Sequence, residues 1–185
     1  MQSYNNTLLN KIRRHIRGGG VIAYPTESCY GFGCDPFNHR AINQILRIKC
    51  RDKAKGLIVV ADNINQLNQL IMPLSYNDKL KLKAYWPGFC SILMPSSIKA
   101  PKILIGKHKT LAVRVSKHDL IRQLCKFLNM PLVSTSANYS GCESIKTYRE
   151  CLQQFGKKVM VLPGNTNFAK KPSTIIDWKT GRIYR

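Results

Sequence analysis

The chain has 185 residues, of which 44% are hydrophobic, and a formal net charge of +21. This length suits one compact domain, and no apolar run approaches the roughly 20 residues that a membrane-spanning helix needs. The excess of positive charge indicates an anionic partner, with nucleic acid as the leading candidate and general solubility as the alternative explanation. A polar start without a small-residue cleavage site argues against a secretory signal, so we expect a cytoplasmic protein that does not enter a membrane.

Helical and strand patterns alternate along the chain. Apolar residues at helical spacing predict a first helix that glycines 18–20 end, and Asp62 is expected to cap a further helix that runs to Ile71. A further helix is predicted from Ala41 onward and would bring Lys49 and Arg51 to its C-terminal end, and others span residues 78–85, 119–128 and 146–155. Strands are predicted at residues 21–24, 57–61, 91–94, 111–115, 132–134, 159–162 and 174–177. This alternation predicts an α/β fold, with residues 96–109 as a mobile basic loop.

The seven cysteines do not suggest disulfide or metal chemistry. Their number is odd, and they form no Cys-x-x-Cys pair. Cys29 has no evident histidine partner, so we interpret it as a buried or half-buried thiol rather than as a nucleophile. We therefore expect no metal site made by the protein's own side chains.

Several common catalytic motifs are absent. The sequence contains no phosphate-binding P-loop, no G-x-S-x-G elbow and no H-E-x-x-H helix, and Pro36 stands where a G-x-G-x-x-G motif needs its third glycine. Small polar residues instead occur at predicted strand ends, with basic residues between them: Pro25-Thr26-Glu27-Ser28, Lys49-x-Arg51, Ser134-Thr135-Ser136-Ala137-Asn138 and Pro172-Ser173-Thr174. Hydroxyls and amides can donate to phosphate and carboxylate oxygens, while Lys and Arg neutralise their charge, so a nucleotide site is indicated. Each run taken alone is also compatible with a capped turn or a solvated helix end.

Taken together and in order, six motifs resemble those of the TsaC/YrdC-like family of threonylcarbamoyl-AMP synthases. They are residues 24–33 (Y-P-T-E-S-C-Y-G-F-G), 49–51 (K-C-R), 86–88 (W-P-G), 111–115 (L-A-V-R-V), 131–141 and 172–174 (P-S-T). The resemblance runs from about Gly19 to the C-terminus and is closest to the short, single-domain form, so that residues 1–185 would be one YrdC-like domain. The chain departs from the usual pattern at Ser28, Asp52 and Phe89, and at Lys55-Gly56 before Leu57.

The resemblance implies a twisted mixed β-sheet with flanking helices around a concave basic cavity. It also implies that L-threonine, bicarbonate and ATP are converted to threonylcarbamoyl-AMP and pyrophosphate, for the threonylcarbamoyl-adenosine modification of tRNA. ATP would be a substrate, Mg²⁺ would be held mainly through ATP, and tRNA and a downstream threonylcarbamoyl-transferase complex would be partners. By this resemblance Lys49 and Arg51 are the candidate catalytic residues.

The resemblance also assigns binding residues by position in this sequence. The ATP site would be formed by Lys49, Arg51, Lys53, Thr110, Ser136 and Asn138. The threonine site would be formed by Thr26, Arg114, Thr135 and Ser173. An arginine suits a bidentate grip on a carboxylate, although Arg114 in a Val-x-Val strand could instead belong to a structural ion pair.

Two other functions remain open from the sequence alone. A non-catalytic RNA- or ribosome-binding module would explain the charge but would have no reason to bind ATP in a threonine-dependent way. A regulatory sensor with the same fold would bind the ligands without releasing pyrophosphate.

Overall fold

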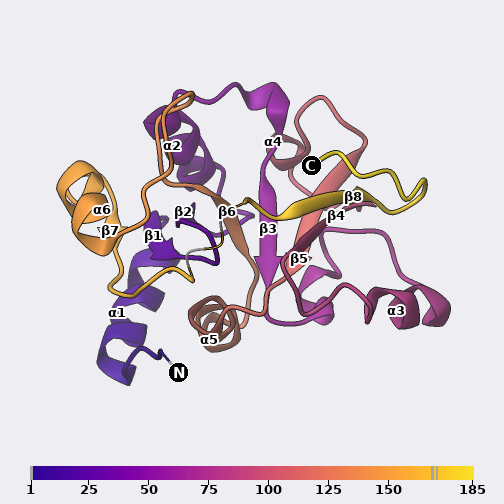
Figure 1. Ribbon diagram of the computed structural model, residues 1–185, viewed down its shortest axis with the longest axis horizontal. Helices are drawn as coiled ribbons and strands as arrows, with labels where there is room; N and C mark the ends of the chain where they lie inside the picture. Colours follow the sequence, from indigo (N-terminus) through magenta and orange to yellow (C-terminus); the bar gives the residue numbers. More distant parts are fainter. Residues whose placement is uncertain (1, 168, 170) are drawn as a thin grey trace.

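One mixed sheet of eight strands organises the chain, as the computed structural model shows (Figure 1). The structure describes residues 2–167, 169 and 171–185. The strands lie in the order β7-β1-β2-β6-β3-β5-β4-β8, with parallel pairs at β1/β7, β3/β5 and β4/β8 and antiparallel pairs elsewhere. Their bounds are β1 Ile22–Pro25, β2 Tyr30–Gly33, β3 Ile58–Ala61, β4 Cys90–Pro95, β5 Thr110–Val115, β6 Leu132–Ser136, β7 Met160–Val161 and β8 Thr174–Asp177.

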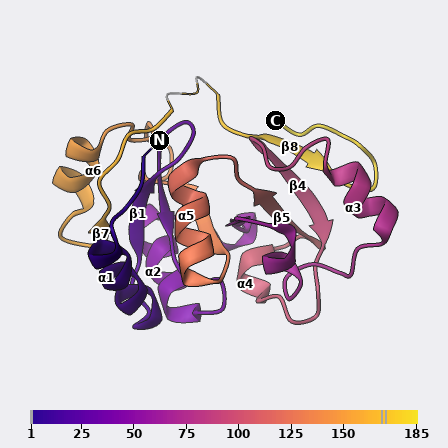
Figure 2. The ribbon, with the colours of Figure 1, turned by 90° about the horizontal axis from the view of Figure 1, so that it is seen from below.

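Helices cover both faces of this sheet. The α-helices are α1 Asn6–Arg17, α2 His39–Lys49, α3 Tyr76–Leu82, α4 Lys102–Ile105, α5 Asp119–Leu128 and α6 Tyr148–Phe155, and two 3-10 turns are η1 Lys53–Lys55 and η2 Ile64–Leu67. Figure 2 shows α1 and α5 side by side next to β1. Among the described residues the longest helix has 12 residues, so none has the length and hydrophobicity that crossing a bilayer requires.

Alternation along the strands divides the apolar side chains between two cores. Leu132 and Val60 join α1 and α5 in one core, while their neighbours Val133 and Val59 join α2, α4 and α6 in the other. Successive strand residues point to opposite faces, so each strand contributes to both cores. The mixed sheet covered by helices confirms the α/β prediction and the expectation of a single mixed-sheet domain.

The local sequence explains where α2 begins and ends. Asn38 caps the helix, because its side chain accepts a hydrogen bond from the backbone of Ala41. Ala41, Ile42 and Ile45 are buried on one side. Cys50 ends the helix in the left-handed conformation, with φ 50°, immediately after Lys49.

Two predicted segments are wrong. The helix expected from Asp62 to Ile71 is only the short turn η2, because Asn63 caps that turn and Ile71 forms a β-bridge with Ser96 instead. The stretch 96–109 is not simply a loop: it contains α4, whose Leu104 is buried and accepts a hydrogen bond from the backbone of Leu57.

Strand β2 was not predicted. Its sequence, Y-G-F-G, contains two glycines, which weaken the usual strand signal. The strand nevertheless pairs with β1 and β6, and Tyr30 and Phe32 are fully buried.

Candidate functional site

A polar cavity of about 490 Å³ lies over the middle of the sheet. Its walls come from the β1–β2 turn, from β5 and β6, and from segments near both sides of β8. The lining residues are Thr26, Ser28, Cys29, Gly31, Arg51, Ile58, Phe89, Arg114, Ser134, Thr135, Ser136, Glu143, Ser144, Lys146, Ala169, Lys171, Pro172, Ser173 and Arg185. Among these, five side chains are basic and one is acidic, which favours anionic ligands.

Strand register explains which side of the sheet carries the cavity. Val60 pairs with both Arg114 and Leu132, so these three side chains share a face. Ser134 follows Leu132 by two residues and therefore lies on that face too. The cavity therefore lies on the face of the sheet that also carries α1 and α5, where β5 and β6 bear polar side chains.

Lys49 is buried beside the cavity and binds the segment that follows β6. Its side chain is only 2% exposed. The ammonium donates to the backbone oxygen of Ser136, to that of Asn138 at 3.0 Å and to the Asn138 Oδ1 at 2.7 Å. An ammonium has three hydrogens, so these three acceptors use its whole donor capacity. The K-x-R and S-x-N motifs are therefore physically joined.

The segment after β6 is also held by hydrogen bonds between its own residues. Ser136 Oγ donates to Asn138 Oδ1 at 2.7 Å, and Asn138 Nδ2 donates to the backbone oxygen of Cys142 at 2.6 Å. Ser136 lines the cavity, whereas Lys49 and Asn138 stand behind it. This geometry gives Lys49 an orienting role toward Ser136 in the described structure.

Arg51 reaches the cavity directly. Its Nε and Nη2 donate to the backbone oxygen of Gly56, at 3.3 and 3.0 Å, and fix the guanidinium at the cavity wall. Burial lowers the pKa of Arg51 below its usual range. An arginine stays protonated at any physiological pH, so it remains a fixed positive charge.

The pKa of Lys49 is expected to limit activity at alkaline pH. Burial, with a further contribution from the charge of Arg51, lowers the pKa of Lys49 from 10.5 to about 8. The neutral amine has one donor fewer, so kcat/KM for the synthase activity expected from the sequence should fall as pH rises through about 8. The unfolded chain binds more protons between about pH 8 and 10.5, so this group makes the fold more stable with rising pH over the same window.

A pH profile of kcat/KM, paired with thermal melts from pH 7 to 10, separates the two effects. The matched variant is Lys49→Arg, which cannot lose its proton in this range and should show no limb near pH 8. A limb that persists in that variant would assign the titration to another group.

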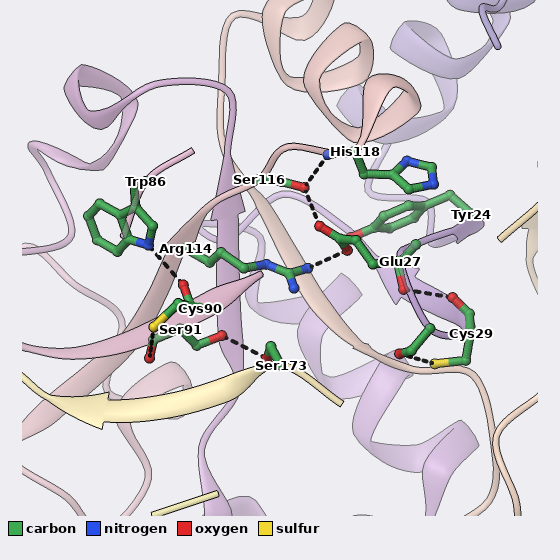
Figure 3. Close-up of polar contacts among 12 residues, drawn as sticks. Tyr24, Glu27, Cys29, Trp86, Cys90, Ser91, Arg114, Ser116, His118 and Ser173 are labelled. Atoms are coloured by element: carbon green, nitrogen blue, oxygen red, sulfur yellow. Dashed lines mark hydrogen bonds and ion pairs between the residues drawn. The ribbon is translucent and has the colours of Figure 1, made fainter. Parts of the chain in front are cut away.

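The other end of the cavity is built around Arg114 of β5. Its Nη2 lies 3.1 Å from Oε2 of Glu27, and both side chains are less than a tenth exposed. The centre of the guanidinium lies 5.2 Å from the ring centroid of Phe89. In Figure 3, Arg114 and Glu27 point toward one another between Ser116 and the pair Ser91 and Ser173.

Hydroxyl groups complete this end. Ser173 Oγ lies 3.0 Å from Ser91 Oγ, and Arg185 donates to the backbone oxygen of Ser173. Thr26 Oγ1 donates to the backbone oxygen of Cys29 at 2.7 Å, which closes the β1–β2 turn and leaves the Thr26 oxygen able to accept. The free thiol of Cys29 is half-buried at the cavity wall.

The structure places the predicted residues in three groups. The cavity wall contains Thr26, Arg51, Arg114, Thr135, Ser136 and Ser173. Lys49 and Asn138 contact Ser136 from behind. Lys53, in η1, and Thr110, at the start of β5, do not line this cavity.

Several lining residues were not predicted. Glu143, Ser144 and Lys146 come from the segment after β6, and Lys171 and Arg185 from either side of β8. No local motif marks them, because the fold alone brings them to the cavity. Glu27 was part of the Y-P-T-E motif, but a buried carboxylate bound to Arg114 could not be read from spacing.

A family model and curated relatives match nearly the whole chain. The Sua5/YciO/YrdC family, described as telomere recombination, matches residues 14–185. The chain is 51% identical over 174 residues to the threonylcarbamoyl-AMP synthase of Methylobacillus flagellatus, covering 94% of this chain and 97% of the relative. It is 48% identical over 178 residues to the enzyme of that name from Chromobacterium violaceum, covering 96% and 92%.

Solved structures share the fold. P. abyssi Sua5 in complex with L-threonine superposes with a TM-score of 0.86 and 27% identity, covering 96% of this chain and 54% of the Sua5 chain. This chain therefore spans about half the length of that protein. E. coli YciO superposes with a TM-score of 0.86 and 25% identity, covering 100% of this chain and 91% of YciO. With a family match over residues 14–185 and near-full-length relatives at about half identity, the chain belongs to the Sua5/YciO/YrdC family.

Proposed function

We propose that this protein is a threonylcarbamoyl-AMP synthase, which forms threonylcarbamoyl-AMP and pyrophosphate from L-threonine, bicarbonate and ATP. One observation carries the proposal: a single cavity has Arg51 and the Lys49-bound Ser136 on its walls together with Arg114, Thr26 and Ser173. Side chains that suit phosphate oxygens and side chains that suit a carboxylate therefore line the same cavity. The relatives named for this reaction, and the Sua5 structure with L-threonine, support the same function.

The proposed reaction needs positioning and charge neutralisation more than side-chain nucleophiles. The threonine amine combines with bicarbonate and releases water, which gives a carbamate. A carbamate oxygen then attacks the α-phosphorus of ATP. The bond between the α-phosphorus and the oxygen that bridges to the β-phosphate breaks, and pyrophosphate leaves. Such transfers depend chiefly on in-line geometry and on cations near the phosphate oxygens. No covalent intermediate on Cys29 is required.

We assign the nucleotide half of the cavity to Arg51 and Ser136. Arg51 would neutralise phosphate charge, and Ser136 would contact the nucleotide while Lys49 and Asn138 hold it in place. Lys53 and Thr110 lie outside the cavity, so they would act at its rim if ATP extends there. This division makes Lys49 an orienting group, because its donors are already bound to the segment after β6.

We assign the threonine half to Arg114, Thr26, Thr135 and Ser173. The guanidinium of Arg114 would bind the carboxylate, and the hydroxyl oxygens of Thr26 and Ser173 would pair with the amine or hydroxyl of the amino acid. The β1–β2 turn holds Thr26, and Ser173 directly precedes β8. In the strand order, β1 and β2 lie toward one edge of the sheet and β8 lies at the other edge. Threonine would therefore bridge Thr26 and Ser173.

The proposed cofactor and partners follow from the chemistry of this cavity. Glu143 is the one carboxylate among the described lining residues, which suits an Mg²⁺ ion that is held mainly by ATP oxygens and water. Nucleotidyl transfer would be the reaction class. ATP and threonine need only a few cations, so we propose that the net charge of +21 serves tRNA and the downstream threonylcarbamoyl-transferase complex in the cytoplasm.

Substrate dependence of pyrophosphate release tests the function. The attacking carbamate forms only when threonine and bicarbonate are both present, so release should need both, and omission of either should reduce it to background. Pyrophosphate is measured by a coupled assay, and the adenylate by mass. Release from ATP alone at an unchanged rate would rule out the synthase. Binding of ATP and threonine without release would indicate a sensor, and RNA binding without ATP binding would indicate a plain RNA-binding module.

A further inference from the structure

A buried carboxylate holds Arg114 from outside the cavity. Glu27 does not line the cavity, whereas Arg114 does. Their contact, Glu27 Oε2 to Arg114 Nη2 at 3.1 Å, is one of two ion pairs among the described residues, and the other, Arg122 with Asp62, is much more exposed on the arginine side. The cavity thus has an ion pair in its wall, with the cation turned to the ligand space.

Glu27 is itself fixed by a chain of hydrogen bonds. Ser116 Oγ donates to Glu27 Oε1 at 2.8 Å, and the backbone N–H of His118 donates to Ser116 Oγ at 3.1 Å (Figure 3). His118 precedes α5, a helix of 10 residues that is anchored in the core. Glu27 Oε1 therefore accepts a hydrogen bond from Ser116, whereas Oε2 is buried and has the ion-pair contact with Arg114 but no hydrogen bond within the described structure. These two contacts restrict rotation of the carboxylate.

The guanidinium of Arg114 is constrained in two directions. Glu27 contacts one edge, and the Phe89 ring lies 5.2 Å from the guanidinium centre. The Nε of Arg114 is buried and makes no hydrogen bond within the described structure. A long side chain with several rotatable bonds would lose this fixed direction without Glu27.

We propose that Glu27 is a positioning residue for substrate binding, which aims Arg114 at the carboxylate of threonine. The inference rests on the proposed function, because it takes threonine as the ligand of Arg114. Two effects of Glu27 oppose each other. Its negative charge repels the threonine carboxylate, and its ion pair orients the guanidinium that binds that carboxylate. The double anchoring of Glu27 and its exclusion from the lining assign the larger effect to orientation.

Glu27→Gln separates these effects because it keeps the size of the side chain and removes its charge. Repulsion alone predicts a lower KM for L-threonine in the variant. Positioning predicts a KM raised by roughly tenfold, with kcat and the KM for ATP changed about twofold or less. A purely structural role would reduce the amount of folded enzyme and leave the KM for L-threonine unchanged.

A ligand without the carboxylate adds a second measurement. L-threoninol keeps the amine, the hydroxyl and the methyl group of threonine, and replaces the carboxylate with an alcohol. Calorimetric Kd values for L-threonine and L-threoninol should differ less in Glu27→Gln than in the wild type, by roughly the same tenfold factor. Ser116→Ala, which frees one oxygen of Glu27, should shift both measurements in the same direction but by less.

The control is Asp62→Asn, which removes the anion of the other ion pair and should leave the KM for L-threonine unaltered. An unchanged or lower KM for L-threonine in folded Glu27→Gln would overturn the proposal. If Glu27→Gln does not fold, Ser116→Ala decides, and a wild-type KM and selectivity there would overturn it. Should the wild type release no pyrophosphate, the proposed function fails, while the two calorimetric affinities still test the positioning role.

Discussion

Lys49→Ala is expected to reduce kcat/KM for ATP by roughly ten- to a hundredfold, while the protein remains folded. The substitution removes the charged donor of three acceptors: the backbone oxygens of Ser136 and Asn138 and the Asn138 side-chain oxygen. Only the backbone oxygen of Asn138 then has no other hydrogen bond among those described, because Asn138 N–H still donates to the Ser136 backbone oxygen and Ser136 Oγ to Asn138 Oδ1. Loss of a charge-assisted hydrogen bond costs about 1.5 to 3 kcal/mol, which corresponds to this range of activity. Arg51→Ala should have a similar effect through loss of a fixed cation at the cavity wall.

Steady-state pyrophosphate release measures both effects, and circular dichroism checks the fold. Lys11→Ala is the matched control, because Lys11 is an exposed lysine of α1 that does not line the cavity. Wild-type turnover in both Lys49→Ala and Arg51→Ala would mean that the K-x-R motif is a structural helix end. A loss in Arg51→Ala alone would restrict Lys49 to a minor orienting role.

Gly106→Ala is expected to lower the free energy of unfolding by roughly 2 to 4 kcal/mol. Gly106 ends α4 at φ 66° and ψ −135°, a region that other residues rarely occupy. A Cβ there would lie 2.4 Å from the backbone oxygen of Ala54 and 2.6 Å from the backbone nitrogen of Gly56. Both contacts are with backbone, so the segment 54–56 would have to move.

The same substitution should reduce activity beyond its effect on stability, because Arg51 is held by the backbone oxygen of Gly56. Urea unfolding measures the stability, and pyrophosphate release at a temperature where the variant is folded measures the activity. Gly141→Ala is the control: its φ of 86° is also positive, but a Cβ would meet nothing within 4 Å. Equal destabilisation of the two variants would show that backbone conformation, rather than the close contact, dominates.

The sequence predicted most accurately those elements whose apolar pattern is contained in one continuous segment. The helix at 119–128 has the predicted bounds, because Leu120, Ile121, Leu124 and Leu128 form a regular buried stripe. β2 was missed since its pairing with β1 and β6 depends on distant segments. The helix expected at 62–71 failed for the same reason, as Ile71 pairs with Ser96.

The candidate site shows the same difference between features encoded locally and features that depend on distant segments. Residues within motifs, such as Thr26, Arg51 and Ser173, were identified from sequence and line the cavity. The burial of Lys49 and the Glu27–Arg114 pair depend on strands that meet only in the folded protein. The sequence could therefore name the polar groups, but it could not tell which of them face the ligand and which hold the others.

The position of β8 has a consequence for the dynamics of the cavity. β8 is the last strand in the order of the sheet, and it pairs along its length with β4. On its other side, the C-terminal residues contact it through the bridge from Ile176 to Ile183 and through backbone hydrogen bonds, such as those from Ile175 to Arg185 and from Tyr184 to Ile175. All four of its residues are partly exposed. Local unfolding begins most easily in partly exposed segments at the edge of a sheet, and opening of β8 together with the C-terminal residues would displace the wall that carries Ser173 and Arg185. A ligand that binds only the closed wall opposes this opening by mass action, so substrate occupancy and the integrity of the sheet edge would be thermodynamically linked.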